Sequence, residues 1–359
     1  MQTVSILIPA YQERGFIGEC LSSVRNFELP PQTSMEILVI DGMSTDGTRD
    51  IVAAASASDP RVRLLDNPRR FQSAALNLGI GQAAGTFIMR LDAHSTYPGD
   101  YLALALETAT RTGSDNTGGI VTTLRRGDHY QAALVQALIT HRFGVGNSGF
   151  RTDAVEGPAD TVPYGFFRRD VFERVGLFDE RLIRAQDYEM NRRIIASGGK
   201  IWRNPKIVVA YYPQPDFRSF ITKQLAYEAP YNAYMWYLAP WSFAARHAVT
   251  AVFAAGVIGG AVLSPISSTV RTIFFAVMLL YLAIAIFSAM GQATRYRQPL
   301  HVIFLPVCFF LYHFLHGLGI IAGLAKLAVG KAPVQGKPEP WAGAGRFRAL
   351  PDNAAIQSA

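Results

Sequence analysis

The sequence predicts an α/β domain with a doubly wound parallel sheet, followed by transmembrane helices. Before Trp241, short apolar runs alternate with amphipathic segments, and most of the charged residues lie in this part of the chain. After Trp241, three apolar runs without charged residues lie between flanking arginines and lysines. Each run is long enough to cross a hydrocarbon core, which requires about 20 residues. We therefore expect a domain of catalytic size that works at a membrane surface.

The first part of the chain alternates strands with helices, which is typical of a parallel sheet. The expected strands are Val4–Ile8, Glu36–Ile40, Arg61–Leu65 and Thr86–Leu91, and the expected helices are Phe16–Phe27, Thr45–Ala57 and Gln72–Ala84. Polar loops follow the strands at Pro9, Asp41 and Asp92. Ligands of such sheets bind beyond the carboxyl ends of the strands. The sequence therefore predicts that these three loops meet at one edge and form the site.

The second part of the chain contains the expected membrane spans, Ala248–Ile266, Thr272–Met290 and Leu300–Leu324. The preceding residues 216–242 are rich in aromatic side chains at helical spacing, as expected for helices in the membrane interface. The alternative is an amphipathic helix buried in the first domain. The resulting division is a catalytic domain over 1–215, interfacial helices over 216–242, three transmembrane helices over 243–329 and a disordered tail over 330–359.

Composition excludes several functional classes. The formal net charge is +7, but arginine and lysine are scattered, which favours contact with anionic lipid or phosphate, and no nucleic-acid partner is expected. The two cysteines, Cys20 and Cys308, can form neither a disulfide framework nor a thiolate metal site. The apolar runs contain no acidic residue, which argues against a transporter.

Four motifs follow one another in the first part of the chain. They are P-A-Y-Q-E from Pro9, D-G-M-S-T-D-G-T from Asp41, the run ending in R-L-D-A-H at His94, and P-Y-G-F-F-R-R-D-V-F from Pro163 with a later Q-D-Y-E from Gln186. This series resembles family 2 glycosyltransferases of the GT-A fold. With the C-terminal helices, the chain is similar to the exopolysaccharide, succinoglycan-type membrane glycosyltransferases. The resemblance implies inverting transfer of a sugar from a nucleotide-diphosphate sugar.

The resemblance implies a divalent cation, Mn²⁺ or Mg²⁺, bound by Asp92 and His94. The cation would neutralise the departing diphosphate as a Lewis acid. The family pattern is usually D-x-D, so His94 is a departure. Imidazole ligates manganese, whereas magnesium prefers oxygen ligands, so we expect manganese. The alternative is an aspartate that caps a turn beside a surface histidine.

The resemblance also implies the residues that bind the donor. It places Tyr11 and Glu13 of the first motif beside the nucleoside and Asp41 on the base or ribose. Arg70 would face phosphate. The predicted donor-binding residues are Pro9, Tyr11, Glu13, Asp41, Arg70 and Asp92. The alternatives are that Tyr11 is a tyrosine packed at a strand end and that Arg70 is an ordinary surface arginine.

Inverting transfer needs a base that takes the proton of the acceptor hydroxyl. The resemblance assigns this role to Asp187; the alternative is the N-cap of a helix over Tyr188–Ala196. The family commonly has an acidic residue where this chain has Gln186, which we expect at the acceptor together with Tyr164 and Gly165. Two further pairs have open assignments: Gly118–Gly119 would shape a pocket or make a plain turn, and Arg192–Arg193 would face the diphosphate or water.

The expected partners are a nucleotide-sugar donor, a polyprenyl-linked saccharide acceptor and membrane lipid, at the cytoplasmic face of the inner membrane. The alternatives are a polyprenyl-phosphate acceptor and a catalytically silent scaffold. With a cytoplasmic first domain, Arg295 and Arg297 obey the positive-inside rule after the second span. Three spans place the tail outside, but Lys326, Lys331 and Lys337 argue for the inside. We expect three spans; the alternative is that the third run doubles back.

Overall fold

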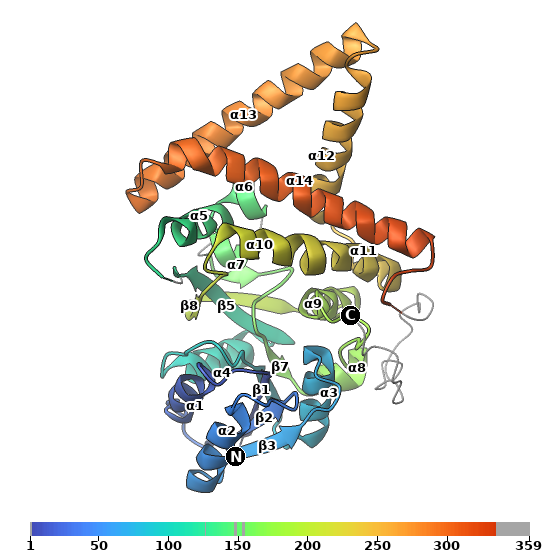
Figure 1. Ribbon diagram of the computed structural model, residues 1–359. Helices are drawn as coiled ribbons and strands as arrows, with labels where there is room; N and C mark the ends of the chain where they lie inside the picture. Colours follow the sequence, from blue (N-terminus) through green and yellow to red (C-terminus); the bar gives the residue numbers. More distant parts are fainter. Residues whose placement is uncertain (1, 126, 147–148, 153–154, 335–359) are drawn as a thin grey trace. The chain divides into compact units, whose positions relative to one another are not determined.

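The computed structural model describes residues 2–125, 127–146, 149–152 and 155–334 (Figure 1). The chain divides into two compact units. The described part of the first unit covers 2–122 and 155–211, and that of the second covers Thr123–Thr152 and Tyr212–Val334. The predicted boundary at residue 215 lies close to Tyr211. The sequence did not indicate that Thr123–Thr152 belongs with the apolar C-terminal part of the chain.

Parallel strands form the first half of the sheet in the first unit, as predicted. Their spatial order is β3-β2-β1-β4, and helices connect them. The elements in chain order are β1 Gln2–Ala10, α1 Ile17–Arg25, β2 Thr33–Asp41, α2 Thr48–Ser58, β3 Val62–Asp66, α3 Gln72–Gln82 and β4 Phe87–Arg90. In the register, Ala10 pairs with Asp41 and Asp41 with Asp66. These strands therefore end at the same level, which brings their loops to one edge.

The second half of the sheet is mixed, so the predicted parallel strands make up only part of it. Strand β7 (Phe166–Arg168) pairs antiparallel with both β4 and β5. The chain leaves the first unit after β5 (Asn116–Thr123) and returns before β7. Strand β7 therefore begins at the edge where β4 ends. The remaining elements are α4 Tyr101–Thr112, β6 Gly157–Pro158, α8 Asp170–Val175, α9 Gln186–Ala196 and β8 Ile201–Tyr211.

One hydrophobic core of the first unit lies between the sheet and the helices α3, α8 and α9. Side chains of the central strands, such as Leu7, Leu38 and Ile88, pack there with Met190 and Ile194. Burying one such aliphatic side chain contributes about 1.5–3 kcal/mol.

The pair Gly118–Gly119 lies within β5, so it does not make the plain turn that was one of its two assignments. A Cβ atom on Gly119 would lie 1.7 Å from the carbonyl oxygen of Ile207, so close strand packing requires glycine there.

The second unit is helical and contains three helices long and apolar enough to cross a membrane. These are α12 Ala245–Leu263, α13 Ser268–Tyr296 and α14 His301–Ala328, each close to a predicted span. The other elements are α5 Tyr130–Ile139, α6 Arg142–Val145, α7 Gly149–Thr152, α10 Phe217–Lys223, the π-helix η1 Gln224–Glu228, α11 Ala229–Leu238 and the 3₁₀ helix η2 Pro240–Ser242. The aromatic segment 216–242 is helical, as predicted. The expected tail lies mostly outside the described residues.

Candidate active site

Backbone strain gathers at the carboxyl edge of the sheet. Left-handed backbone conformations, with φ from 57° to 64°, occur there at Gln12, Met43, Arg70, Tyr164 and Ala185. In non-glycine residues each such conformation costs on the order of 1–3 kcal/mol, and such strain is commonly retained at functional sites. Gln12, Met43 and Tyr164 lie within the motifs, Arg70 is a predicted donor-binding residue, and Ala185 directly precedes the Q-D-Y-E motif. The strain therefore lies at or beside the residues of the expected site.

An exposed aromatic face lies over the end of β2. Tyr11 is 45% exposed, so its ring keeps an accessible face. Its ring packs against Gly42, where an added Cβ atom would approach the ring to 3.0 Å. The guanidinium of Arg70 lies 5.8 Å from the ring centroid. The structure therefore brings Tyr11 and Arg70, two of the predicted donor-binding residues, together beside the end of β2. Tyr11 directly follows Pro9–Ala10 of the first motif.

Asp41 is the last residue of β2 and directly precedes Gly42, and only one of its two carboxylate oxygens accepts hydrogen bonds from described residues. Its Oδ2 accepts hydrogen bonds from the Ser44 backbone N–H and from Arg49, both at 2.8 Å. The side chain is fully buried, and Oδ1 has no hydrogen-bond partner among the described residues. A buried carboxylate oxygen without a donor is costly. It is suited to receive a hydroxyl or ring N–H of a ligand, as the resemblance implies for Asp41.

Asp92 and Asp187 share one arginine. Arg90, at the end of β4, is buried and lies 2.7 Å from Asp92 Oδ1 and 3.2 Å from Asp187 Oδ2. Its guanidinium also lies 5.5 Å from the centroid of the Tyr164 ring, and its backbone N–H donates to the carbonyl oxygen of Gly165. Residues of the third and fourth motifs therefore meet around one buried cation, although they are far apart in the sequence.

The surroundings of Asp187 fit a base. It is the second residue of α9, and no side chain caps that helix, so the N-cap alternative is wrong. Burial raises the pKa of Asp187, Arg90 opposes this rise and Asp92 adds to it. About a third of the side chain, 35%, is still exposed. A carboxylate with a raised pKa and an open face can accept a proton from a bound hydroxyl.

The histidine of the D-x-H motif is oriented toward Asp92. His94 Nδ1 lies 3.1 Å from Glu13 Oε1, and His94 Nε2 lies 4.0 Å from Asp92 Oδ2. If Nδ1 donates its proton to Glu13, Nε2 carries the lone pair and can act as a cation ligand. Because Asp92 Oδ2 faces the same space, these two atoms fit a divalent cation whose other ligands come from diphosphate and water. The described residues contain no group of three or more potential metal ligands.

Two glutamines complete the contacts around Asp92. Gln72, the first residue of α3, donates to Asp92 Oδ1 at 3.3 Å, and Gln186 donates to Gln72 Oε1 at 2.6 Å. Gln186 is only 5% exposed. Its contact with the acceptor stays a prediction, but this burial favours a role in supporting its neighbour Asp187. The contacts close a ring from Asp187 through Arg90, Asp92 and Gln72 back to Gln186.

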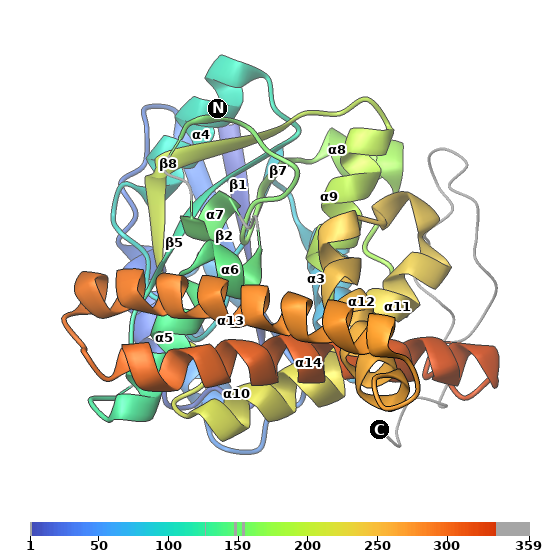
Figure 2. The ribbon, with the colours of Figure 1, turned by 90° about the horizontal axis from the view of Figure 1, so that it is seen from above.

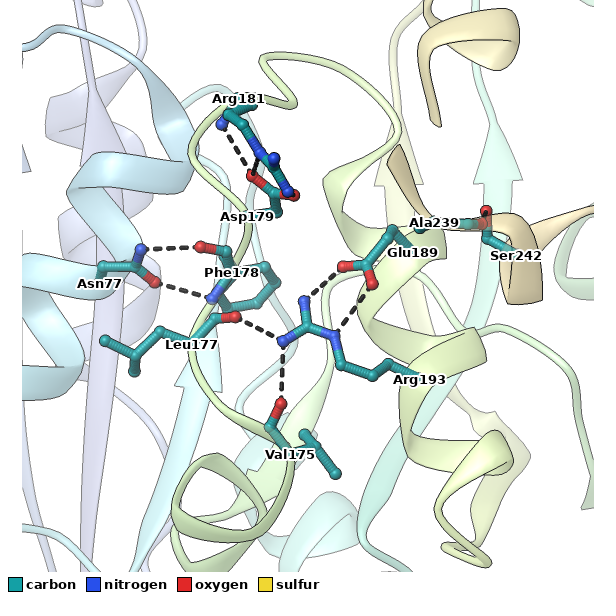
Figure 3. Close-up of polar contacts among 10 residues, drawn as sticks. All are labelled: Asn77, Val175, Leu177, Phe178, Asp179, Arg181, Glu189, Arg193, Ala239 and Ser242. Carbon is teal, nitrogen blue, oxygen red and sulfur yellow. Dashed lines mark hydrogen bonds and ion pairs between the residues drawn. The ribbon is translucent and has the colours of Figure 1, made fainter. Parts of the chain in front are cut away.

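A buried ion pair fixes the far side of the helix that carries Asp187 (Figure 3). Arg193 is fully buried, pairs with Glu189, and donates to the carbonyl oxygens of Val175 at 3.0 Å and Leu177 at 2.7 Å. Arg193 therefore faces neither the diphosphate nor water, which corrects both sequence interpretations of it.

The loop between α8 and α9 is anchored from α3 as well. The Asn77 side chain exchanges hydrogen bonds with the backbone N–H and carbonyl of Phe178, each at 2.9 Å (Figure 3). Asp179 pairs with Arg181 at 2.6 Å within the same loop. The segment G-L-F-D-E, which begins at Gly176, therefore has a structural role, because its contacts hold α9 in position.

Sequence reasoning missed Arg90 and Gln72. For Arg90 a signal existed, because an arginine inside an apolar strand needs a buried partner. Residues two apart on a strand share one face, and Arg90 is two residues from Asp92. For Gln72 there was no local signal, since a glutamine at the start of a helix is ordinary.

Known proteins give an independent comparison. The profile of the family described as Glycosyl transferase family 2 matches residues 5–176. The succinoglycan biosynthesis protein ExoA of Rhizobium meliloti (strain 1021) is 34% identical over 211 residues, which are 58% of this chain but only 63% of that protein.

A second relative aligns along almost its entire length. It is the dolichyl N-acetyl-alpha-D-glucosaminyl phosphate 3-beta-D-2,3-diacetamido-2,3-dideoxy-beta-D-glucuronosyltransferase of Methanococcus voltae, 27% identical over 343 residues, which are 91% of this chain and 98% of that protein. Among solved structures, mannosyltransferase PcManGT from Pyrobaculum calidifontis, in complex with GDP-Man and Mn²⁺, has a TM-score of 0.53 at 19% identity, covering 91% of this chain and 87% of that chain. Together with the profile match, these similarities show that this chain carries a glycosyltransferase domain of family 2 with the GT-A fold.

Proposed function

We propose that this glycosyltransferase transfers a sugar, with inversion, from a nucleotide-diphosphate sugar to a saccharide carried on a polyprenyl lipid at the cytoplasmic face of the membrane. The observation that carries the proposal is the shared arginine, because Arg90 joins the carboxylate of the D-x-H motif to the expected base, Asp187. Donor chemistry and acceptor chemistry thereby meet at one point.

The donor would lie along the edge of the sheet. Tyr11 offers a face for the base, Asp41 Oδ1 an acceptor for a hydroxyl or ring N–H, and Arg70 a positive charge for phosphate. Asp92 and His94 would hold the divalent cation, which neutralises the diphosphate as a leaving group. Glu13 would orient His94 and so support the cation site, in addition to its predicted place beside the nucleoside.

The acceptor hydroxyl would approach the open face of Asp187. Asp187 takes the hydroxyl proton while the oxygen forms a bond to the anomeric carbon, and the bond from that carbon to the diphosphate breaks with its electron pair. Attack from the face opposite the leaving group inverts the anomeric centre. The name of the archaeal relative, whose acceptor is a sugar phosphate of dolichol, supports a lipid-linked saccharide as acceptor.

The test is transfer by the purified full chain in lipid nanodiscs. The protein is incubated with radiolabelled nucleotide sugars, Mn²⁺ or Mg²⁺, and either lipid-linked saccharides or plain polyprenyl phosphate. We expect label in the lipid-linked saccharide, with the inverted anomer by NMR. Label on polyprenyl phosphate alone would favour the alternative acceptor, and nucleotide binding without any transfer would favour a silent scaffold.

The cation assignment has its own control. Asp92→Ala should abolish the Mn²⁺ dependence of nucleotide binding, measured by calorimetry, because it removes the carboxylate oxygen that faces His94. Unchanged Mn²⁺-dependent affinity in this variant would contradict the assignment. Exchange of the exposed Asp170, which pairs with Arg168, for alanine is the matched control and should leave binding unchanged.

A further inference from the structure

We infer that helix α14 lies in the plane of the membrane and contacts the acyl chains with one face, so that the chain crosses the bilayer only twice. This inference concerns the second unit alone and is independent of the proposed reaction. The three apolar helices differ in how far their neighbours cover them. Buried residues make up 6% of the apolar window of α12 and 17% of that of α13, but 44% of that of α14.

Helices α12 and α13 form a hairpin that suits a bilayer. The 19 residues of α12 span about 28 Å, close to the thickness of a hydrocarbon core. The longer α13 is tilted against it (Figure 1). Near the tip the two helices touch, since a Cβ atom on Gly260 would lie 2.2 Å from the ring of Phe274. Large apolar side chains point outward from both helices, among them Val252, Val262 and Phe287.

Helix α14 runs across the open end of this hairpin (Figure 1). In the view from above, α12 is seen nearly end-on, whereas α14 is seen along its length (Figure 2). The contact between them sets the depth of α14. Thr250, in the second turn of α12, lies 2.9 Å from His316, and a Cβ atom on Gly317 would lie 2.0 Å from the carbonyl oxygen of Thr250. The middle of α14 therefore lies level with the beginning of α12.

Charged helices run beside α14. The ring of Phe220 in α10 lies 5.6 Å from that of Tyr312, and further along, a Cβ atom on Gly319 would lie 2.7 Å from Ala229. Between these contacts lie Lys223 and Glu228, an ion pair at 3.5 Å with 30% of each side chain exposed. If α14 crossed the membrane, this pair would lie near the bilayer centre. Insertion of each charged residue there costs roughly 2.5–3.5 kcal/mol, so such a placement is disfavoured.

The open face of α14 is apolar along its length. Ile303, Val307 and Leu311 are 64%, 57% and 36% exposed, and Ala322 and Ala325 continue the same exposed face. We call these five residues the α14 stripe. An in-plane helix holds such a stripe at one depth in the interface, where its apolar side chains meet acyl chains. The polar residues His301 and His313 are buried on the opposite face.

An in-plane α14 also removes the conflict in the charges. Arg246 is the second residue of α12, Arg295 and Arg297 lie at the end of α13, and Lys326 and Lys331 lie at the end of α14. With two crossings all of these residues are on one side, where they face anionic headgroups, and Arg271 at the hairpin tip is alone on the other. The packing thus favours two crossings over the three spans expected from the sequence.

The test compares three single cysteines in a background with Cys20 and Cys308 replaced by alanine. Ser268→Cys lies at the hairpin tip, Gln298→Cys precedes α14, and Ser358→Cys lies in the tail. With an impermeant thiol reagent on intact cells, we expect labelling at the tip alone, and labelling at the other two positions only after the membrane is opened. Labelling of the tail in intact cells, or no labelling of the tip, would overturn the inference. A C-terminal epitope tag on the otherwise unaltered chain, exposed to protease on intact cells, repeats the test without altered cysteines.

Depth along α14 provides a second, independent measurement. In the same background, a fluorophore is attached at Ile303→Cys, Leu311→Cys or Ala322→Cys of the α14 stripe and quenched by lipids that carry spin labels at known depths. We expect the same shallow depth at all three positions. A central position deeper than both ends by roughly 10 Å, as expected for a helix that crosses a core about 30 Å thick, would show that α14 spans the membrane.

Discussion

Helix α9 carries two acidic residues, Asp187 and Glu189, and each pairs with an arginine, but the two pairs lie in different surroundings. Glu189 and Arg193 are fully buried on one helix face, and Arg193 also binds two backbone carbonyl oxygens. The Asp187 side chain is 35% exposed, and it shares Arg90 with Asp92. The Glu189–Arg193 pair is closed to solvent and has one cation for one carboxylate. The Asp187 pair is open to solvent, and there one cation, Arg90, serves two carboxylates. The Q-D-Y-E motif therefore combines an acid that is buried in the structure with the acid that we propose as the base.

The largest expected effect is on the open pair. Asp187→Asn keeps the shape of the side chain but removes the base, and such roles contribute about 10²–10⁴-fold in rate. Donor affinity and thermal stability should be unchanged. Transfer rate and calorimetric donor binding are measured side by side. A variant that loses donor binding as severely as turnover would give Asp187 a structural role and remove the contrast with Glu189.

The closed pair should respond in stability instead. Arg193→Met leaves Glu189 buried without its cation, and breaking a buried pair in this way costs about 3–5 kcal/mol. Thermal unfolding in detergent measures the loss. Adding Glu189→Leu to the same chain should recover much of the stability, because an apolar pair of similar volume often replaces an ion pair without loss. If the double variant were less stable than Arg193→Met, the pair would not be the source of the effect.

A third pair, Glu13 with His94, tests whether orientation alone matters at the open edge. Glu13→Gln keeps a hydrogen-bond acceptor but weakens the hold on the histidine tautomer. Loss of such a supporting partner commonly reduces metal affinity by 10–100-fold. Mn²⁺ titration of nucleotide binding checks this, and folding should be intact. His94→Asp should in turn favour Mg²⁺. Equal Mn²⁺ affinity in Glu13→Gln and the unaltered chain would show that Glu13 does not support the cation site.

The smallest expected effect is in the pH profile. The pKa of Asp187 is raised, so the transfer rate should fall as pH decreases through this raised pKa, because the base becomes protonated. A raised carboxyl pKa also stabilises the fold below the pKa of the unfolded state, and this contribution is lost as pH rises through the folded pKa. The residual transfer rate of Asp187→Asn should not fall in this pH range. If the rate of the variant falls in the same way, another group is responsible for the pH dependence.

Much of the first unit could be predicted because its signals are local. Short apolar runs ending in polar loops identified β1, β2, β3 and β4. The motifs singled out Asp92 and Asp187, which the structure brings together around Arg90, and their roles stay predictions. The antiparallel strand β7 was missed because its partners are distant in sequence. Helix α2 was predicted to begin at Thr45 but begins at Thr48, since Asp46 Oδ1 instead accepts hydrogen bonds from the backbone and side chain of Thr48.

The functional difference between two similar acids could not be predicted. Nothing in the local sequence shows that Glu189 faces the core while Asp187 faces the site, because a helix of this length has polar residues on both sides of the motif. Only the packing of the α8–α9 loop on Arg193 decides it. The same holds for Gln186, whose burial depends on Gln72, more than a hundred residues earlier.

The division of the chain into two units also affects how the protein is made. Helix α5 lies within Thr123–Thr152, and its side chains Leu134, Val135 and Leu138 are buried in the helical unit. Its residue Tyr130 contacts His301, 171 positions later. During synthesis, α5 therefore leaves the ribosome long before the helix that covers it. A soluble fragment ending at Tyr211 would keep α5 without its cover and would tend to aggregate, so production of the catalytic domain alone requires that the 123–152 segment also be removed or redesigned.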